Sequence, residues 1–173
     1  MRLLTIYSRR ISEANSTRKV ANTQIIKTKI EPFVREWLKH KFNQPFFKME
    51  LPLRDSDAVH EFDAVSLDRK VVAGIKSASG KTRRQKNPAA KCQGAYAELY
   101  FLSLIEADKK FLVLTNQPFY ELFKRAATGK VATGIELLYC KLSPELEALM
   151  KTVYEDAADE IDRGAGGSPF GAE

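Results

Sequence analysis

The sequence contains only two cysteines and two histidines among its 173 residues, and this scarcity excludes several kinds of site. Cys92 and Cys140 are far apart and no CxxC pair occurs, so we expect neither a zinc site nor a disulfide framework. No apolar run approaches the roughly 18 residues of a membrane span, and the apolar stretch within residues 1–6 is too short for a secretory signal. We therefore expect a protein of the reducing cytoplasm that has no membrane partner.

Acidic residues are missing from the middle of the chain. Residues 69–97 contain eight Lys or Arg and no Asp or Glu, whereas residues 141–173 contain three basic and eight acidic residues. The net charge of +6 is thus unevenly distributed, with a basic centre before an acidic end. Such a distribution indicates a polyanionic partner, although a solvated loop that serves solubility explains the charge equally well.

Hydrophobic periodicity predicts one α/β domain over residues 1–162, followed by a disordered tail over residues 163–173. The order of predicted elements indicates a mixed sheet flanked by helices, with an antiparallel meander and then a parallel crossover through a helix. In chain order, these elements are a helix (31–42), three strands (47–51, 59–66 and 71–77), a helix (89–107), a strand (111–115), a short helix (118–127), a strand (134–141) and a helix (143–161).

An acidic residue and a lysine stand close to each other on two of the predicted strands. Asp63 lies on strand 59–66, and Lys76 comes at the end of strand 71–77, across a short turn. The hairpin is therefore expected to place a carboxylate and an ammonium group side by side. Metal-dependent cleavage of phosphodiester bonds uses such a pair, because a carboxylate holds a hard cation and a lysine stabilises charge near the phosphate. The simpler alternative is a carboxylate on the solvent face and a lysine whose stem reaches the surface.

The order of elements, Asp63 on the second strand and Ile75-Lys76 at the end of the third resemble the PD-(D/E)xK nuclease superfamily over about residues 30–141. The resemblance implies the restriction-endonuclease-like fold, a three-layer sandwich with a central mixed β-sheet flanked by helices. It also implies that Asp63 and a second acidic residue bind Mg²⁺ or Mn²⁺, while Lys76 orients the attacking water. Members of this fold without nuclease activity also exist, so the fold alone does not determine the function.

Gly74 departs from the superfamily pattern, which has an acidic residue two positions before the lysine. One interpretation is that the acid has moved to helix 89–107, where Glu98 can reach into the space that Gly74 leaves open. A second interpretation uses Gln93 and Tyr96, whose Gln-x-x-Tyr spacing resembles the helix motif of the RecB-like branch. We favour Glu98, because a divalent cation that lacks a carboxylate gains more from an acid than from an amide. The third interpretation is that catalysis has been lost.

Other candidate residues are expected around this centre. Glu61 is two residues before Asp63 and shares its strand face, so it is either a metal ligand or an exposed partner of a basic residue in the turn. Glu36 resembles in placement the accessory acid of some superfamily members. Glu31 competes for that role, and a solvated side chain is the simpler account of both glutamates. His60 is expected to point to the opposite face of the strand and to have a structural role.

The sequence therefore predicts a metal-dependent endonuclease that hydrolyses DNA in the cytoplasm. A homodimer is expected on chemical grounds, since two sites related by a two-fold axis suit the cutting of both strands of a duplex. The alternative is a catalytically inactive protein of the same fold that binds nucleic acid, and a third hypothesis is an interaction protein whose basic loop contacts an acidic protein. Contacts with phosphates are expected from Lys81, Arg83, Arg84, Lys86 and Lys91.

Overall fold

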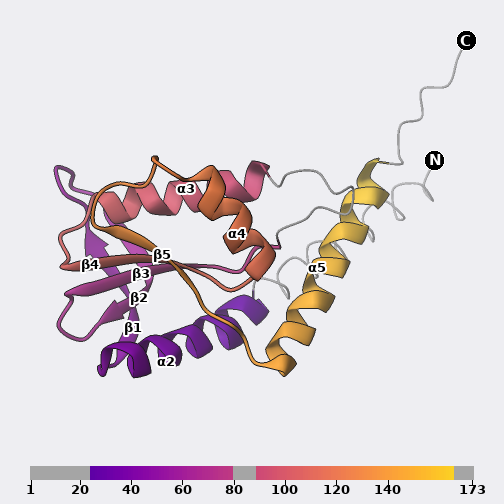
Figure 1. The fold of residues 1–173 in the computed structure, drawn as a ribbon, viewed down its shortest axis with the longest axis horizontal. Helices are drawn as coiled ribbons and strands as arrows, with labels where there is room; N and C mark the ends of the chain where they lie inside the picture. The colour runs from indigo at the N-terminus through magenta and orange to yellow at the C-terminus, as the bar shows by residue number, and fades with distance from the viewer. Residues whose placement is uncertain (1–23, 80–88, 166–173) are drawn as a thin grey trace, which may run out of the picture.

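The computed structural model of the chain describes residues 24–79 and 89–165, and of residues 156–165 it describes only the backbone. A five-stranded sheet runs through the molecule with helices on both of its faces (Figure 1). The strands lie in the order β1-β2-β3-β4-β5, antiparallel from β1 to β3 and parallel from β3 to β5. The predictions of an α/β fold and of a mixed sheet with a parallel crossover are therefore confirmed.

Most predicted elements are present, with differences at their ends. The π-helix η1, which was not predicted, leads directly into α2. Helix α3 ends four residues earlier than predicted, because the Leu104 N–H donates to the Phe101 carbonyl in a tight turn that directs Ile105 into the core. Helix α5 continues through residues that were predicted to belong to the tail. The elements are η1 (Ile26–Ile30), α2 (Glu31–Phe42), β1 (Phe46–Pro52), β2 (Val59–Ser66), β3 (Val71–Lys76), α3 (Ala89–Ser103), β4 (Lys109–Leu114), α4 (Gln117–Ala126), β5 (Ile135–Tyr139) and α5 (Pro144–Ala165).

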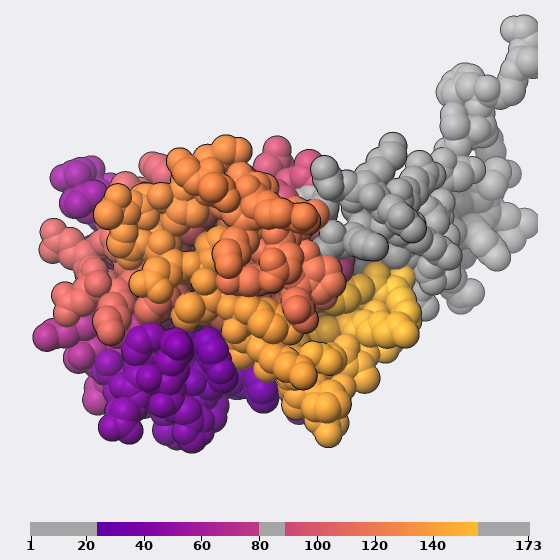
Figure 2. Space-filling view, in the orientation of Figure 1, coloured from indigo at the N-terminus to yellow at the C-terminus, as the bar shows by residue number. Residues whose placement is uncertain are grey.

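Two hydrophobic cores lie on opposite faces of the sheet. On one face, α3 and α4 pack on side chains that include Phe62, Val72 and Leu112. On the other face, α2 and α5 pack on side chains that include Ala73 and Val113. The space-filling view shows α4 and the segment after it (orange) on one part of the surface and α2 (indigo) on another (Figure 2). Every residue of β3 before Lys76 is buried, because helices cover a parallel sheet on both sides.

None of the helices in residues 24–79 and 89–165 combines the length and the apolar character that a membrane crossing requires.

A β-bulge in β2 disturbs the sheet near Asp63. Phe47 of β1 faces Val65, and Met49 faces Phe62, so β2 contains one more residue than β1 between these pairs. The pairing of β2 with β3 includes only Ala64 with Ala73 and Val65 with Val72. Bulges bend a strand and change the direction of its side chains. Asp63 therefore lies at the point where β2 diverges from β3.

The turn between β2 and β3 is stabilised by Ser66, which is fully buried. Its hydroxyl donates to Asp68 Oδ1 at 2.6 Å and accepts from the Val71 N–H at 2.9 Å. The Arg69 N–H donates to the Ser66 carbonyl, which closes the turn at 2.9 Å. These bonds fix the start of β3, and Lys76 lies at the other end of the same strand.

We predict that Ser66→Ala lowers the free energy of unfolding by about 1–3 kcal/mol, because the buried Val71 N–H loses its acceptor. Urea denaturation followed by circular dichroism measures this loss. Ser56→Ala is the matched control, since Ser56 accepts an N–H bond from Ala58 in an exposed connection where water can replace the hydroxyl. We expect the control to change stability by less than about 0.5 kcal/mol. Equal losses in the two variants would contradict the assignment of Ser66.

Candidate active site

Where β2 diverges from β3, the side chain of Asp63 forms a hydrogen bond that the backbone of β2 would form in a regular sheet. Its Oδ2 accepts the Ile75 N–H at 2.8 Å, so the carboxylate takes the place of a backbone acceptor from the neighbouring strand. This contact places Asp63 one residue away from Lys76. The sequence prediction that Asp63 and Lys76 converge at one end of the hairpin thus matches the geometry, and the bulge provides the physical reason.

Glu98 reaches this point from α3. Its Oε2 accepts a hydrogen bond from Lys76 Nζ at 2.6 Å, and the residue is only 6% exposed. A methyl group added at Gly74 would lie 2.6 Å from both the Cδ and the Oε1 of Glu98. The Glu98 side chain therefore fills the space that a side chain at Gly74 would need. This is the geometry that a migrated acid requires.

His60 lies beside Glu98 and not away from the site. Its ring stacks on Phe101 with a centroid distance of 3.9 Å, and its Nε2 is 3.6 Å from Glu98 Oε1. The Nε2 is buried and forms no hydrogen bond with any described residue. Glu98 therefore has Lys76 next to one carboxylate oxygen and His60 next to the other. The sequence pattern indicated only that His60 faces away from Asp63, and it could not show that α3 brings Glu98 to that face.

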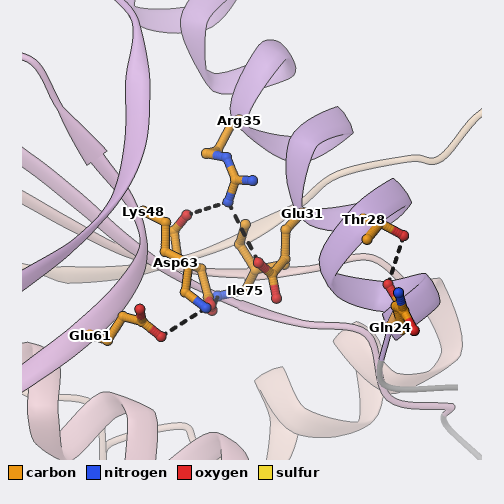
Figure 3. A network of polar contacts seen from close by, with 8 residues as sticks. All are labelled: Gln24, Thr28, Glu31, Arg35, Lys48, Glu61, Asp63 and Ile75. Carbon is orange, nitrogen blue, oxygen red and sulfur yellow. Dashed lines mark hydrogen bonds and ion pairs between the residues drawn. The ribbon is translucent and has the colours of Figure 1, made fainter. Parts of the chain in front are cut away.

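Glu31 and Arg35 approach Asp63 from α2 (Figure 3). Arg35 Nη1 donates to the backbone oxygen of Asp63 at 2.8 Å and lies 3.6 Å from Glu31 Oε2. Glu31 is 6% exposed, and its Oε2 forms no hydrogen bond with any described residue. The expectation that Glu31 is solvated is therefore wrong. The first turn of α2 packs against the sheet and buries this side chain.

Lys48 and Glu61 form the outer side of the same group (Figure 3). Lys48 Nζ lies 2.8 Å from Glu61 Oε1, and the Glu61 side chain is 54% exposed. The hydrogen bond that Lys48 donates to Glu61 raises the pKa of Lys48, with smaller contributions from Glu31 and Asp63. Glu61 is thus an exposed ion-pair partner, although its partner is on β1 and not in the turn after β2.

Burial raises the pKa of the Asp63 carboxyl above its ordinary value, and the nearby Glu31 and Glu98 act in the same direction. The hydrogen bond from the Ile75 N–H and the charge of Lys76 oppose this rise. Asp63 is therefore less stable as a carboxylate here than in water. A bound cation would relieve this cost, because it favours the charged form of the acid.

The carboxyl groups around Asp63 are of the ligand type that a hard divalent cation prefers. Asp63 and Glu98 provide carboxylate oxygens, and Mg²⁺ is often held by one or two carboxylates together with waters and substrate phosphates. Within the described residues, no three side chains of the types His, Cys, Asp and Glu lie close enough together to hold a metal ion. The candidate ligands are thus two carboxylates, Asp63 and Glu98. Glu31 is a third acid, whose charge contributes to raising the pKa of Asp63.

Three further predicted residues that the structure describes, Glu36, Gln93 and Lys91, have their contacts elsewhere or are exposed. Glu36 is exposed and pairs with Lys39 at 2.8 Å and with His40 at 3.3 Å. Gln93 is exposed on α3. Lys91 contacts the hydroxyl and the backbone oxygen of Ser79, and desolvation lowers its pKa. The predicted phosphate contacts Lys81, Arg83, Arg84 and Lys86 lie outside the described residues.

We predict that Asp63→Asn stabilises the fold at neutral pH by up to about 1 kcal/mol, because the variant removes a carboxylate that burial and two nearby acids disfavour. The folded-state pKa of Asp63 is raised, so its contribution to stability is complete below the unfolded pKa and is lost as the pH rises through the folded pKa. The advantage of the variant should therefore shrink at acidic pH. Urea denaturation at several pH values tests this, with the exposed Asp57→Asn as control. A variant that is less stable than wild type at pH 7 would contradict the prediction.

No family model matches the chain, and neither a curated protein nor a solved structure is similar enough to be matched to it. The functional assignment therefore depends on the geometry around Asp63, Lys76 and Glu98.

Proposed function

We propose that the protein is a metal-dependent nuclease with a restriction-endonuclease-like fold, and that it hydrolyses phosphodiester bonds in DNA. The observation that carries the proposal is the position of Glu98, whose carboxyl group fills the space above Gly74 and contacts Lys76. An acid from α3 thereby stands where the superfamily pattern has an acid on β3. Together with Asp63, it completes the set of two carboxylates and one lysine that the chemistry needs.

Each of the three residues has a distinct task in this proposal. Asp63 and Glu98 hold Mg²⁺ or Mn²⁺, and a bound cation supplies positive charge that stabilises the phosphate in the transition state. Lys76 orients the attacking water or adds a second positive charge at the same place. Because Lys76 and Glu98 are in contact, each limits the freedom of the other. The ion pair thus positions the lysine before substrate arrives.

The surroundings of Asp63 support a functional role over a purely structural one. A structural acid is normally paired and has a lowered pKa, whereas burial and two nearby acids raise the pKa of Asp63. A buried group with a perturbed pKa beside a lysine and other acids is typical of functional sites. The sequence that follows β3 is rich in Lys and Arg and has no acidic residue up to residue 97, a composition that suits a polyanionic substrate.

We predict that Asp63→Ala and Lys76→Met each lower the rate of DNA cleavage by at least about 100-fold, because the first removes a ligand of the cation and the second removes a positive charge at the phosphate. Nicking of supercoiled plasmid in Mg²⁺ or Mn²⁺ measures the rate, and single-stranded DNA and RNA serve as alternative substrates. DNA affinity in EDTA should change only a few-fold. The exposed Asp57→Asn and Lys124→Met are controls that should cleave as wild type does.

The outcomes of this experiment separate the competing functions. Wild-type protein that binds DNA in a salt-dependent way but never cleaves it would favour the inactive nucleic-acid-binding protein. Protein that shows no salt-dependent affinity for nucleic acid would remove both hypotheses and favour a protein partner. Unchanged cleavage in Lys76→Met would exclude Lys76 from the mechanism.

We predict that an acid placed on β3 restores part of the cleavage activity that is lost when Glu98 of α3 is replaced. Glu98→Ala should abolish cleavage, and Gly74→Ala should do the same because its methyl group displaces the Glu98 carboxyl. The double variant Gly74→Asp with Glu98→Ala returns an acid to the position two before Lys76, into space that the shortened helix residue vacates. It should cleave at least about tenfold faster than Glu98→Ala alone, which corresponds to an activation free energy lower by about 1.4 kcal/mol.

The double variant needs a control for simple steric relief. Gly74→Ala combined with Glu98→Ala fits the same space without an acid, so it should fold but remain inactive. If that apolar double variant recovered as much activity as the acidic one, Glu98 would be a packing residue and not a metal ligand.

A further inference from the structure

Two adjoining hollows lie at the end of β3 that is remote from Lys76. Their volumes are about 450 Å³ and 290 Å³, and both are lined by Arg54, Arg69, Ile105 and Glu106. Three connections form the walls: β1 to β2, β2 to β3, and α3 to β4. The first and the last of these lie together at the end of the molecule away from α5 (Figure 1). Pockets of this size accommodate small-molecule ligands.

Hydrogen bonds between the connections hold the walls together. The Arg54 N–H donates to the Leu104 carbonyl at 2.6 Å, and the Lys109 N–H donates to the Lys70 carbonyl at 3.0 Å. Lys110 Nζ donates to the Ile105 carbonyl at 3.4 Å. Each wall is therefore tied to another, and the hollows do not depend on a single mobile loop.

The two hollows differ in chemical character. The larger is lined by four basic residues (Arg54, Arg69, Lys70 and Lys110) and two acidic residues (Glu106 and Asp108), which leaves an excess of two positive charges. The smaller is lined by four apolar residues (Leu51, Pro52, Leu53 and Ile105), together with Arg54, Arg69 and Glu106. Both arginines line both hollows, so guanidinium groups stand at the boundary between a cationic and an apolar compartment.

The backbone of Arg69 gives independent support for a ligand. Arg69 has a φ of 58°, in the left-handed region that favours glycine. It follows a turn closed by its own N–H to the Ser66 carbonyl, where hairpins of this kind usually have glycine. A bulky residue in such a conformation costs stability and is found mostly at functional sites. The turn imposes the left-handed conformation, and Arg69 forms no ion pair with any described residue, so no ion pair within the described residues accounts for an arginine where glycine is preferred.

We propose that these hollows form a binding site for a nucleoside monophosphate. A phosphate dianion matches the excess of two positive charges, and arginine binds phosphate with two parallel hydrogen bonds. A planar base fits the apolar compartment and can stack on a guanidinium group. The two carboxylates in the cationic compartment are suitable acceptors for ribose hydroxyl groups.

This site is separate from the proposed active site. Lys76 ends β3, whereas Arg69 and Lys70 precede its first residue, so the length of the strand lies between them. None of the residues that line the hollows takes part in the proposed cleavage. The inference therefore goes beyond the proposed function, and it holds whether or not the protein cuts DNA.

Isothermal titration calorimetry tests the proposal with the full chain at about 0.15 M salt, where surface charge is largely screened. The probes are AMP, UMP, adenosine and inorganic phosphate, and EDTA keeps cation binding at Asp63 out of the measurement. We expect AMP or UMP to bind with a Kd on the order of 100 µM. Adenosine and phosphate should each bind at least about tenfold more weakly, because each fills only one compartment.

Arg69→Gly tests the role of the arginine side chain in a variant that we expect to remain folded. Glycine suits the left-handed backbone, so the variant should raise Tm by about 2–4 °C while it weakens nucleotide binding by at least about tenfold. Asn43→Gly is the matched control, because Asn43 has a φ of 53° at the end of α2 and lines neither hollow. The control should change stability without changing nucleotide affinity.

Three results would overturn the proposal. The first is no binding of either nucleotide at millimolar concentration. The second is an affinity for inorganic phosphate equal to that for AMP, which would leave only a general anion site. The third is unchanged nucleotide affinity in Arg69→Gly. Because all of these measurements are made in EDTA, none of them depends on cleavage activity.

Discussion

The absence of a side chain at Gly74 is the constraint on which the centre of this structure depends. It lets the Glu98 carboxyl reach β3, where Lys76 bonds to it at 2.6 Å. A side chain at Gly74 would push Glu98 away and leave both Lys76 and His60 without their acidic neighbour. One glycine on a buried strand therefore couples α3 to the end of β3.

A second local irregularity acts together with the first. The bulge in β2 ends its regular pairing with β3 at Ala64, which leaves the Ile75 N–H without a strand partner. Asp63 accepts that N–H through its side chain, and Arg35 binds the carbonyl of the same residue. The side chain of Asp63 is thus fixed by β3, and its backbone carbonyl is fixed by α2. Two departures from regular sheet structure, a glycine and a bulge, bring two carboxylates to one lysine.

The sequence predicts the elements well because the periodic signal is strong where helices cover the sheet. Strand 59–66 has the predicted ends, and the burial of β3 follows from its apolar run. The convergence of Asp63 and Lys76 was predictable from a short hairpin. The burial of Glu31, the bond from Arg35 and the neighbourhood of His60 were not predictable. They depend on how α2 and α3 pack on the sheet, and a bulge adds one residue without any signal in the local pattern.

A purely structural account of the centre encounters an energetic difficulty. A buried ion pair such as that of Lys76 and Glu98 is often no more stable than apolar residues of similar volume. Here the pair is accompanied by a half-buried Asp63 whose pKa is raised and by a Glu31 oxygen without a hydrogen bond among the described residues. Stability alone would favour apolar side chains at these positions, such as those in the two cores on either side. The persistence of the acidic groups beside one lysine is explained if the negative charge has a use outside folding, and a hard cation is the partner that oxygen ligands of this kind bind best.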